Sequence, residues 1–273
     1  AMKQLTRDFP GDDEATLFYS LALLGRSEGV RDVPTYLEAA KIAETVYRRN
    51  PDHPGASHYW IHGMDDPEHA AGALEAAQGL ARVAPGAGHA QHMASHIFMA
   101  LGMWDEVPGA NTHAMHVVDA QRVASGKLAV SCFHYDEWKQ YAYFQQGRIA
   151  EGLALLQSCA TTGRDQLGRL QGKDEATFRT RWTGSLVTMR AQAVIGAADW
   201  NGPAAKLVVD VPANASVAAW DHFTTGYAAA ERGDLAVATA AQDALSALVA
   251  AAKPAPDDHQ GLDYLHVLND ELT

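Results

Sequence analysis

Residues 34–47 read PTYLEAAKIAETVY, and this stretch decides the fold class. A proline stands in the first turn of the predicted helix, and the Asn-Pro-Asp run at 50–52 ends it. The apolar side chains recur every three or four residues, which places them on one side of a helix. They include Leu37, Ala40, Ala43 and Tyr47.

The same periodicity extends over most of the chain and predicts an all-α fold. The further predicted helices span 12–24, 67–83, 89–101, 106–123, 128–146, 149–159, 175–195, 203–209, 218–231 and 235–252. A β-branched run occurs only at 206–211, and it is too short to build a sheet. Alanine, the strongest helix former, is the most frequent residue.

Composition and charge exclude several classes of protein. With 47% hydrophobic and 20% charged residues, the 273-residue chain is typical of a globular protein rather than a disordered one. A formal net charge of −12 argues against a nucleic-acid partner, because phosphate backbones select basic surfaces. Apolar runs are too short for a membrane span.

Short turns with a similar sequence recur along the chain, each with a glycine where one helix gives way to the next. These turns read LGMWDE at 101–106, QGRIAE at 146–151 and RGDLAVA at 232–238, and the linkers read FPGDDEA at 9–15 and NPDHPGA at 50–56. The turn glycines are Gly25, Gly63, Gly102, Gly147, Gly196 and Gly233. A small residue there lets the second helix cross the first closely.

With these turns and linkers the chain resembles tetratricopeptide-repeat proteins, in which antiparallel helix pairs stack into a right-handed superhelix. The resemblance implies one α-solenoid domain over residues 1–273, with about six degenerate helix-pair units longer than the family's usual period. Residues 1–10 read as the end of a second helix, so we expect a further segment or a cap before them.

Most of the 13 histidines lie between His53 and His134, and several share helical spacings. His58 and His62 are four residues apart, and His92 and His96 repeat that spacing. His89 precedes His92 by three residues and so shares its face. Imidazoles four residues apart on a helix reach one metal ion, which favours a metal site.

The repeat register adds a sixth histidine. His89 and His134 stand equally far before the turn glycines Gly102 and Gly147, and PGASH at 54–58 aligns His58 with His89. First helices of a repeat superhelix line its concave surface, so these side chains are predicted to face inward. The predicted metal ligands are His58, His62, His89, His92, His96 and His134.

The strings HPGASHYWIH at 53–62 and GHAQHMASHIF at 88–98 also resemble a histidine-rich group of bacterial tetratricopeptide-like proteins. This resemblance covers about residues 50–150 and implies no particular reaction. Catalytic residues therefore stay unassigned.

An imidazole-rich site with few carboxylates suits copper, iron or zinc better than magnesium or calcium. A dinuclear copper site with three imidazoles per ion is one form, and a mononuclear zinc or iron site with His and Asp ligands is another. Asp136 and Glu137 beside His134 can complete such a site or fix an imidazole tautomer. The residues predicted to contact a substrate are Tyr59, Tyr135 and Trp138.

Three functional hypotheses follow. A copper- or iron-dependent oxidoreductase is favoured over a zinc-dependent hydrolase, because no obvious general base accompanies the histidines. A peptide-binding or assembly scaffold is the non-enzymatic alternative, although its groove would present histidine in place of the usual Asn, Lys and Arg. The partner is thus a small molecule or a peptide in the concave groove. The alternative to metal binding by these histidines is a buried, hydrogen-bonded polar network.

Cysteine usage and the N-terminus leave the compartment open. Cys132 and Cys159 lack metal or redox spacing, and two buried thiols are expected rather than a disulfide. The opening Ala1-Met2-Lys3 resembles the remainder of a cleaved tag. The expected location is cytoplasmic or, if a leader preceded this segment, periplasmic or secreted. The sequence does not indicate an oligomeric state.

Overall fold

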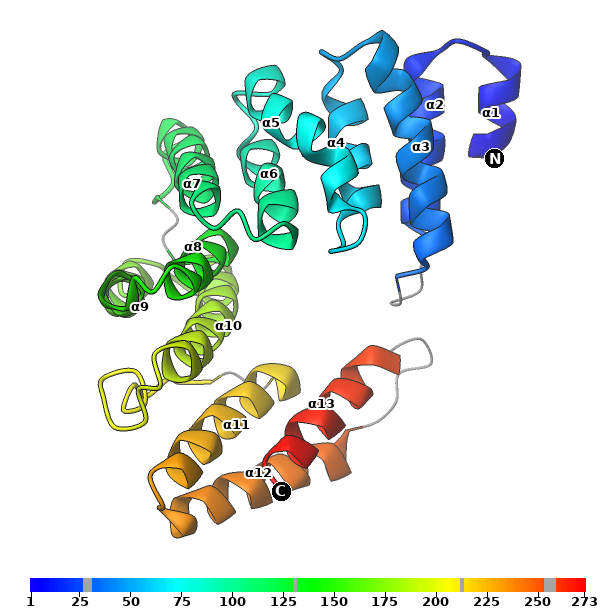
Figure 1. Cartoon of the computed structure of the whole chain (residues 1–273). Coiled ribbons are helices and arrows are strands. Elements are labelled where there is room, and N and C mark those ends of the chain that lie inside the picture. The colour runs from blue at the N-terminus through cyan, green and yellow to red at the C-terminus, as the bar shows by residue number, and fades with distance from the viewer. Residues whose placement is uncertain (27–30, 130–131, 212–213, 253–258) are drawn as a thin grey trace. The chain divides into compact units, whose positions relative to one another are not determined.

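The computed structural model describes residues 1–26, 31–129, 132–211, 214–252 and 259–273, with the side chains of 259–263 outside the description. Within these ranges the chain forms helices and turns and no strand (Figure 1). The all-α prediction is therefore confirmed. Contacts divide the chain into two compact units, Ala1–Lys127 and Leu128–Thr273.

The first unit is a succession of helices in which each packs against the next. Helix α4 also packs against α2 and α6, so every second helix is in contact there (Figure 1). This arrangement places the histidines of α4 beside those of α6. The elements are α1 (Met2–Asp8), α2 (Asp13–Leu24), α3 (Val33–Arg49), α4 (Pro54–Met64), the 3-10 helix η1 (Ala70–Ala73), α5 (Leu74–Val83), α6 (Gly88–Ala100) and α7 (Glu106–Ala124).

Two glycines of this unit have different roles. Gly102 follows α6 with a φ of 68°, a left-handed conformation that suits glycine, as expected for a turn. Gly63 lies inside α4 and does not end it. A Cβ at Gly63 would stand 2.6 Å from the Cβ of Ala40 and 2.8 Å from the backbone oxygen of Tyr36 in α3. Glycine at this position therefore permits the close contact between α3 and α4.

The second unit contains two groups of mutually packed helices. Helices α8, α9 and α10 contact one another, as do α11, α12 and α13, and α10 contacts α11. Its larger core is apolar and includes Trp182, Leu186 and Met189. The elements are α8 (His134–Gln145), α9 (Ile149–Leu167), α10 (Gly172–Gly196), α11 (Ala215–Glu231), α12 (Leu235–Ala251) and α13 (His259–Glu271).

Two predicted helices of this unit were wrong in part or whole. Residues 203–206 form a turn and 207–209 are not helical, because the Asp199 carboxylate accepts a hydrogen bond from the Ala204 N–H (3.2 Å) and caps a turn. The helix predicted from residue 128 begins only at His134. Residues 130 and 131 of that prediction lie outside the described part of the chain.

The expectation of two buried thiols was also wrong. Cys132 and Cys159 form a disulfide that joins the segment before α8 to α9. Cys132 has a φ of 71°, which is unusual for a residue with a Cβ. Its backbone N–H donates to the Asp136 carboxylate (2.9 Å), so the disulfide and this bond together fix the start of α8.

A search of the described helices finds none that is long and apolar enough to cross a membrane.

Candidate metal centre

The α4 histidines meet at their ring tips. His58 and His62 lie one turn apart, and their Nε2 atoms are 3.1 Å apart. The ring of His89, from the first turn of α6, has its centroid 5.0 Å from that of His58. One ligand nitrogen from each of the three lies within 4.8 Å of the others. A single ion can therefore be reached by all three.

The α6 histidines repeat this arrangement. The Nε2 atoms of His92 and His96 are 3.2 Å apart, and their ring centroids are 5.0 Å apart. His92 is only 1% exposed, whereas His96 is half-buried. The two groups adjoin, because the rings of His62 and His96 are 6.1 Å apart. We call the five residues His58, His62, His89, His92 and His96 the histidine cluster.

A helix outside the cluster fixes the His92 tautomer. The Asn111 side chain of α7 is fully buried, and its amide nitrogen donates to the Val107 carbonyl (2.9 Å). The Asn111 oxygen therefore faces His92 and accepts a hydrogen bond from Nδ1 (2.6 Å). With the proton of the neutral ring on Nδ1, its lone pair is on Nε2.

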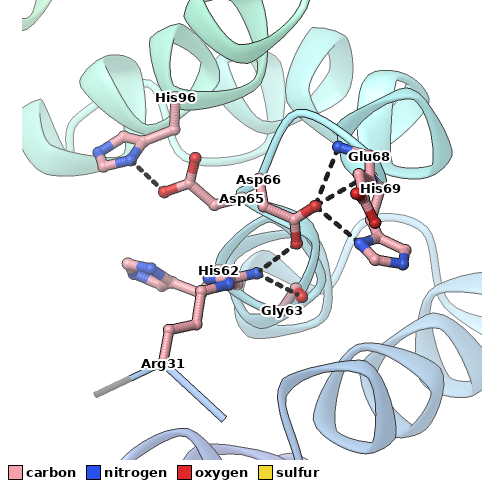
Figure 2. Close-up of polar contacts among 8 residues, drawn as sticks. All are labelled: Arg31, His62, Gly63, Asp65, Asp66, Glu68, His69 and His96. Atoms are coloured by element: carbon pink, nitrogen blue, oxygen red, sulfur yellow. Dashed lines mark hydrogen bonds and ion pairs between the residues drawn. The ribbon is translucent and has the colours of Figure 1, made fainter. Parts of the chain in front are cut away.

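A carboxylate does the same for His96. The Nδ1 of His96 donates to Asp65, which directly follows α4, over 2.7 Å (Figure 2). The neutral His96 ring then also carries its lone pair on Nε2. A carboxylate on the distal nitrogen is the usual partner of a metal-bound histidine, where it orients the ring and increases its basicity.

The turn that carries Asp65 is held by a polar network. Arg31 donates to the carbonyls of His62 (3.3 Å) and Gly63 (3.0 Å), which are at the C-terminal end of α4. The same guanidinium bonds to Asp66 (3.1 Å), which also accepts from the backbone N–H and Nδ1 of His69 (3.0 and 2.7 Å). Figure 2 shows these contacts around the turn.

This network affects the Asp66 carboxyl itself. Burial acts to raise its pKa, but the hydrogen bonds from His69 and Arg31 outweigh burial and hold the pKa below its usual value. Asp66 is therefore ionised at neutral pH and keeps its partners. The turn thus presents Asp65 to His96 from a fixed backbone.

The electrostatics of the α4 pair favour the neutral, metal-binding form of histidine. Burial, followed by the charges of neighbouring imidazoles, lowers the pKa of His58 to about 3. Burial, with the charges of His96 and His89, lowers that of His62 to about 4. A neutral imidazole offers the lone pair that a metal ion needs.

The nitrogen–nitrogen distances fit shared coordination. Two imidazoles that bind one zinc-sized ion tetrahedrally, with bonds of about 2.0–2.1 Å, place their nitrogens roughly 3.3 Å apart. The observed separations are 3.1 Å in α4 and 3.2 Å in α6. Both pairs therefore have the geometry of metal ligands.

Of the residues predicted to contact a substrate, Tyr59 lies beside the cluster. Its ring stacks on that of His58, with centroids 5.6 Å apart and planes at 28°. Burial raises the pKa of the Tyr59 phenol, so its hydroxyl stays protonated at neutral pH. It can therefore donate a hydrogen bond to a molecule bound at the cluster.

The remaining predicted residues belong to the second unit. His134 begins α8, where its ring contacts Trp138 (centroids 5.4 Å) and adjoins Tyr135 (6.2 Å). The Glu137 carboxylate lies 3.9 Å from His134 Nδ1, and Asp136 is bonded to the backbone at Cys132. That His134 acts as a sixth ligand, with Tyr135 and Trp138 as substrate contacts, stays a prediction.

Sequence reasoning missed Asp65, Asn111 and Arg31. Asp65 is 31 residues from His96, and Asn111 is 19 residues from His92, so no local spacing joins them. The one available signal was the Asp-Asp pair at 65–66, which follows His62 after two residues.

Comparison with known proteins adds no relative. No protein-family model matches the chain, and no curated protein is significantly similar to it. The resemblance to a histidine-rich, tetratricopeptide-like group therefore stays a prediction.

Proposed function

We propose that this protein binds a transition-metal ion through the imidazoles of the histidine cluster. The observation that carries the proposal is the orientation of the α6 pair. The Nδ1–H groups of His92 and His96 donate hydrogen bonds to Asn111 and Asp65, which leaves the lone pairs on the two Nε2 atoms, 3.2 Å apart. The α4 pair repeats the Nε2 separation on the neighbouring helix.

A hydrogen-bonded histidine network explains this geometry less well. A hydrogen bond between two imidazoles needs a proton on one of the facing nitrogens. When both rings of the α6 pair are neutral, the protons on Nδ1 leave two lone pairs facing each other over 3.2 Å. A cation between them converts this repulsion into two coordinate bonds.

The donor set guides the choice of metal. Imidazole nitrogen suits copper, iron and zinc, whereas magnesium and calcium require oxygen ligands. We propose copper or iron, with a redox reaction on a small molecule that contacts Tyr59. The nearby Asp65 carboxylate is hydrogen-bonded to His96, so its role is to orient that ligand. It does not act as the water-activating base found in helical zinc proteases.

We further propose that the helices form a tetratricopeptide-like solenoid whose concave groove holds the substrate. Contacts between every second helix at α2, α4 and α6, and at α8 and α10, support this arrangement. Gly102, Gly147 and Gly233 have left-handed backbone conformations and lie in the recurring turn sequences, which further supports a helical-repeat arrangement.

Metal analysis of protein purified without a histidine tag tests the function. We expect bound copper, iron or zinc in a whole-number ratio to protein, and a lower melting temperature after chelation, since an ion bound only by the folded state stabilises it. Metal-free protein whose melting is unchanged by chelator and by added metal would contradict the proposal and leave the peptide-binding scaffold. Oxidation of small phenols or amines by added dioxygen, catalysed by the copper- or iron-loaded protein, tests the redox reaction.

A further inference from the structure

We infer that the histidine cluster holds two metal ions, one at each end. His58, His62 and His89 hold the first ion, and His92 and His96 hold the second. This inference rests on the proposed function and assigns the number of ions and the ligands of each.

Ring separations divide the cluster in this way. Within the first group, His58 lies 4.7 Å from His62 and 5.0 Å from His89. Within the second, His92 lies 5.0 Å from His96. Two imidazoles on one tetrahedral ion have ring centres roughly 5 Å apart. The short pairs within each group therefore match the spacing of two imidazoles on one ion.

The contacts between the groups are longer than these short pairs. His62 and His96 are 6.1 Å apart, and His89 and His92 are 6.3 Å apart. His62 and His89 are themselves 6.4 Å apart, but both are close to His58, and one nitrogen of each of the three lies within a common 4.8 Å. The five rings do not share one ligand group: one nitrogen each of His58, His62 and His89 forms a first group, and His92 and His96 belong to another. Two ions, which lie about 3.5–4 Å apart in dinuclear enzymes, can bind both groups.

The two ions would have different surroundings. The second ion would have ligands oriented by Asn111 and Asp65, and the Asp65 carboxylate would offset part of its charge. The first ion would have three imidazoles and Tyr59 beside it. A molecule that contacts Tyr59 would therefore lie nearer the first ion.

Zinc stoichiometry tests this division, because Zn²⁺ is redox-silent and accepts imidazole ligands. The full chain without a tag is titrated with Zn²⁺, dialysed and analysed for zinc per chain. We expect two zinc ions in the wild type, one in the His58→Ala/His62→Ala variant and one in the His92→Ala/His96→Ala variant. The matched control is His113→Ala/His116→Ala, which removes two exposed histidines of α7 and should leave two ions.

Any other zinc stoichiometry would contradict either the two-site division or the proposed function. One zinc in the wild type overturns the division into two sites, as does a double variant that retains two ions or none. No zinc in the wild type contradicts the proposed function itself. Helical content is checked by circular dichroism. If a double variant fails to fold, the single variants His62→Gln and His96→Gln replace it, and each should weaken one of the two binding steps at least tenfold while the other step stays unchanged.

Discussion

The two histidine pairs share a spacing but not an environment. The α4 pair is half-buried, and burial lowers the pKa of both of its rings. The α6 pair includes the buried His92, and both of its Nδ1 atoms are bonded to residues outside α6. Spacing along a helix therefore brings the ring tips together, but neighbouring elements decide which nitrogen carries the proton. This difference predicts unequal responses to mutation.

The largest effect is expected when the buried member of the α6 pair is removed. His92→Ala deletes a predicted ligand and leaves the buried Asn111 oxygen without its donor, which costs roughly 1–3 kcal/mol of unfolding free energy. His58→Ala deletes a ligand from a half-buried position. Calorimetric zinc titration should show one binding step weakened more than tenfold in each variant. Removing a residue that binds the metal is expected to cost more affinity than removing a residue that only orients such a ligand. Urea unfolding of the metal-free proteins should show a larger loss for His92→Ala, and equal losses would remove the distinction between the pairs.

The next effect concerns the carboxylate that orients His96. Asp65→Asn keeps the shape of the side chain but removes its charge, so zinc affinity at the α6 pair should fall about 10–100-fold while the α4 step is unchanged. The matched control is Glu68→Gln, which removes a charge from an exposed side chain three residues further along. If both variants weaken zinc binding equally, the effect is one of general charge and not of His96 orientation.

A smaller effect should follow from pushing α4 away from α3. In Gly63→Ala the added methyl group meets Ala40 and the Tyr36 backbone, and overpacking of this kind costs roughly 1–3 kcal/mol. Part of that cost is offset because alanine is the better helix former. The control is Gly109→Ala in α7, where nothing lies within 4 Å of the added Cβ. Urea unfolding should show a loss for the first variant only, and a neutral Gly63→Ala would mean that α3 and α4 are not held this closely.

The smallest effect is a pH dependence at the turn after α4. Because hydrogen bonds hold the Asp66 pKa below its ordinary value of 3.8, ionised Asp66 stabilises the fold above that pH. This contribution is lost as the pH falls through the folded-state pKa. Asp66→Asn should cost about 0.5–1 kcal/mol at pH 6, after allowance for partial exposure. The gap from the wild type should narrow below about pH 4 in urea unfolding. A gap that is constant from pH 6 to pH 3 would assign the effect to shape and not to charge.

Local pattern predicted the elements that form the candidate site. The periodicity of residues 34–47 gave α3, and the four-residue histidine spacings gave pairs whose nitrogens face each other. Both are consequences of helix geometry within one element. The helix predicted at 203–209 was wrong because a side-chain bond from Asp199 caps a turn there, which residue periodicity does not register.

The sequence did not predict the contacts between elements. The Cys132–Cys159 disulfide depends on α9 packing beside the segment before α8, and the role of Gly63 depends on its distance from Ala40. Neither residue pair shares a local motif. The sequence indicated that these residues were present, but only packing defined what each one touches.

By itself, the sequence determined that the chain is helical and that five histidines of residues 58–96 lie on α4 and α6, because both follow from a period of 3.6 residues. Only the tertiary structure decided that the two pairs adjoin and that Asp65 and Asn111 set the tautomers of the α6 pair. It also decided that Arg31 holds the turn after α4. The physical reason is the distance along the chain over which each effect acts. Helix periodicity acts over a few residues, whereas imidazole orientation depends on hydrogen bonds between side chains that are brought together by helix packing.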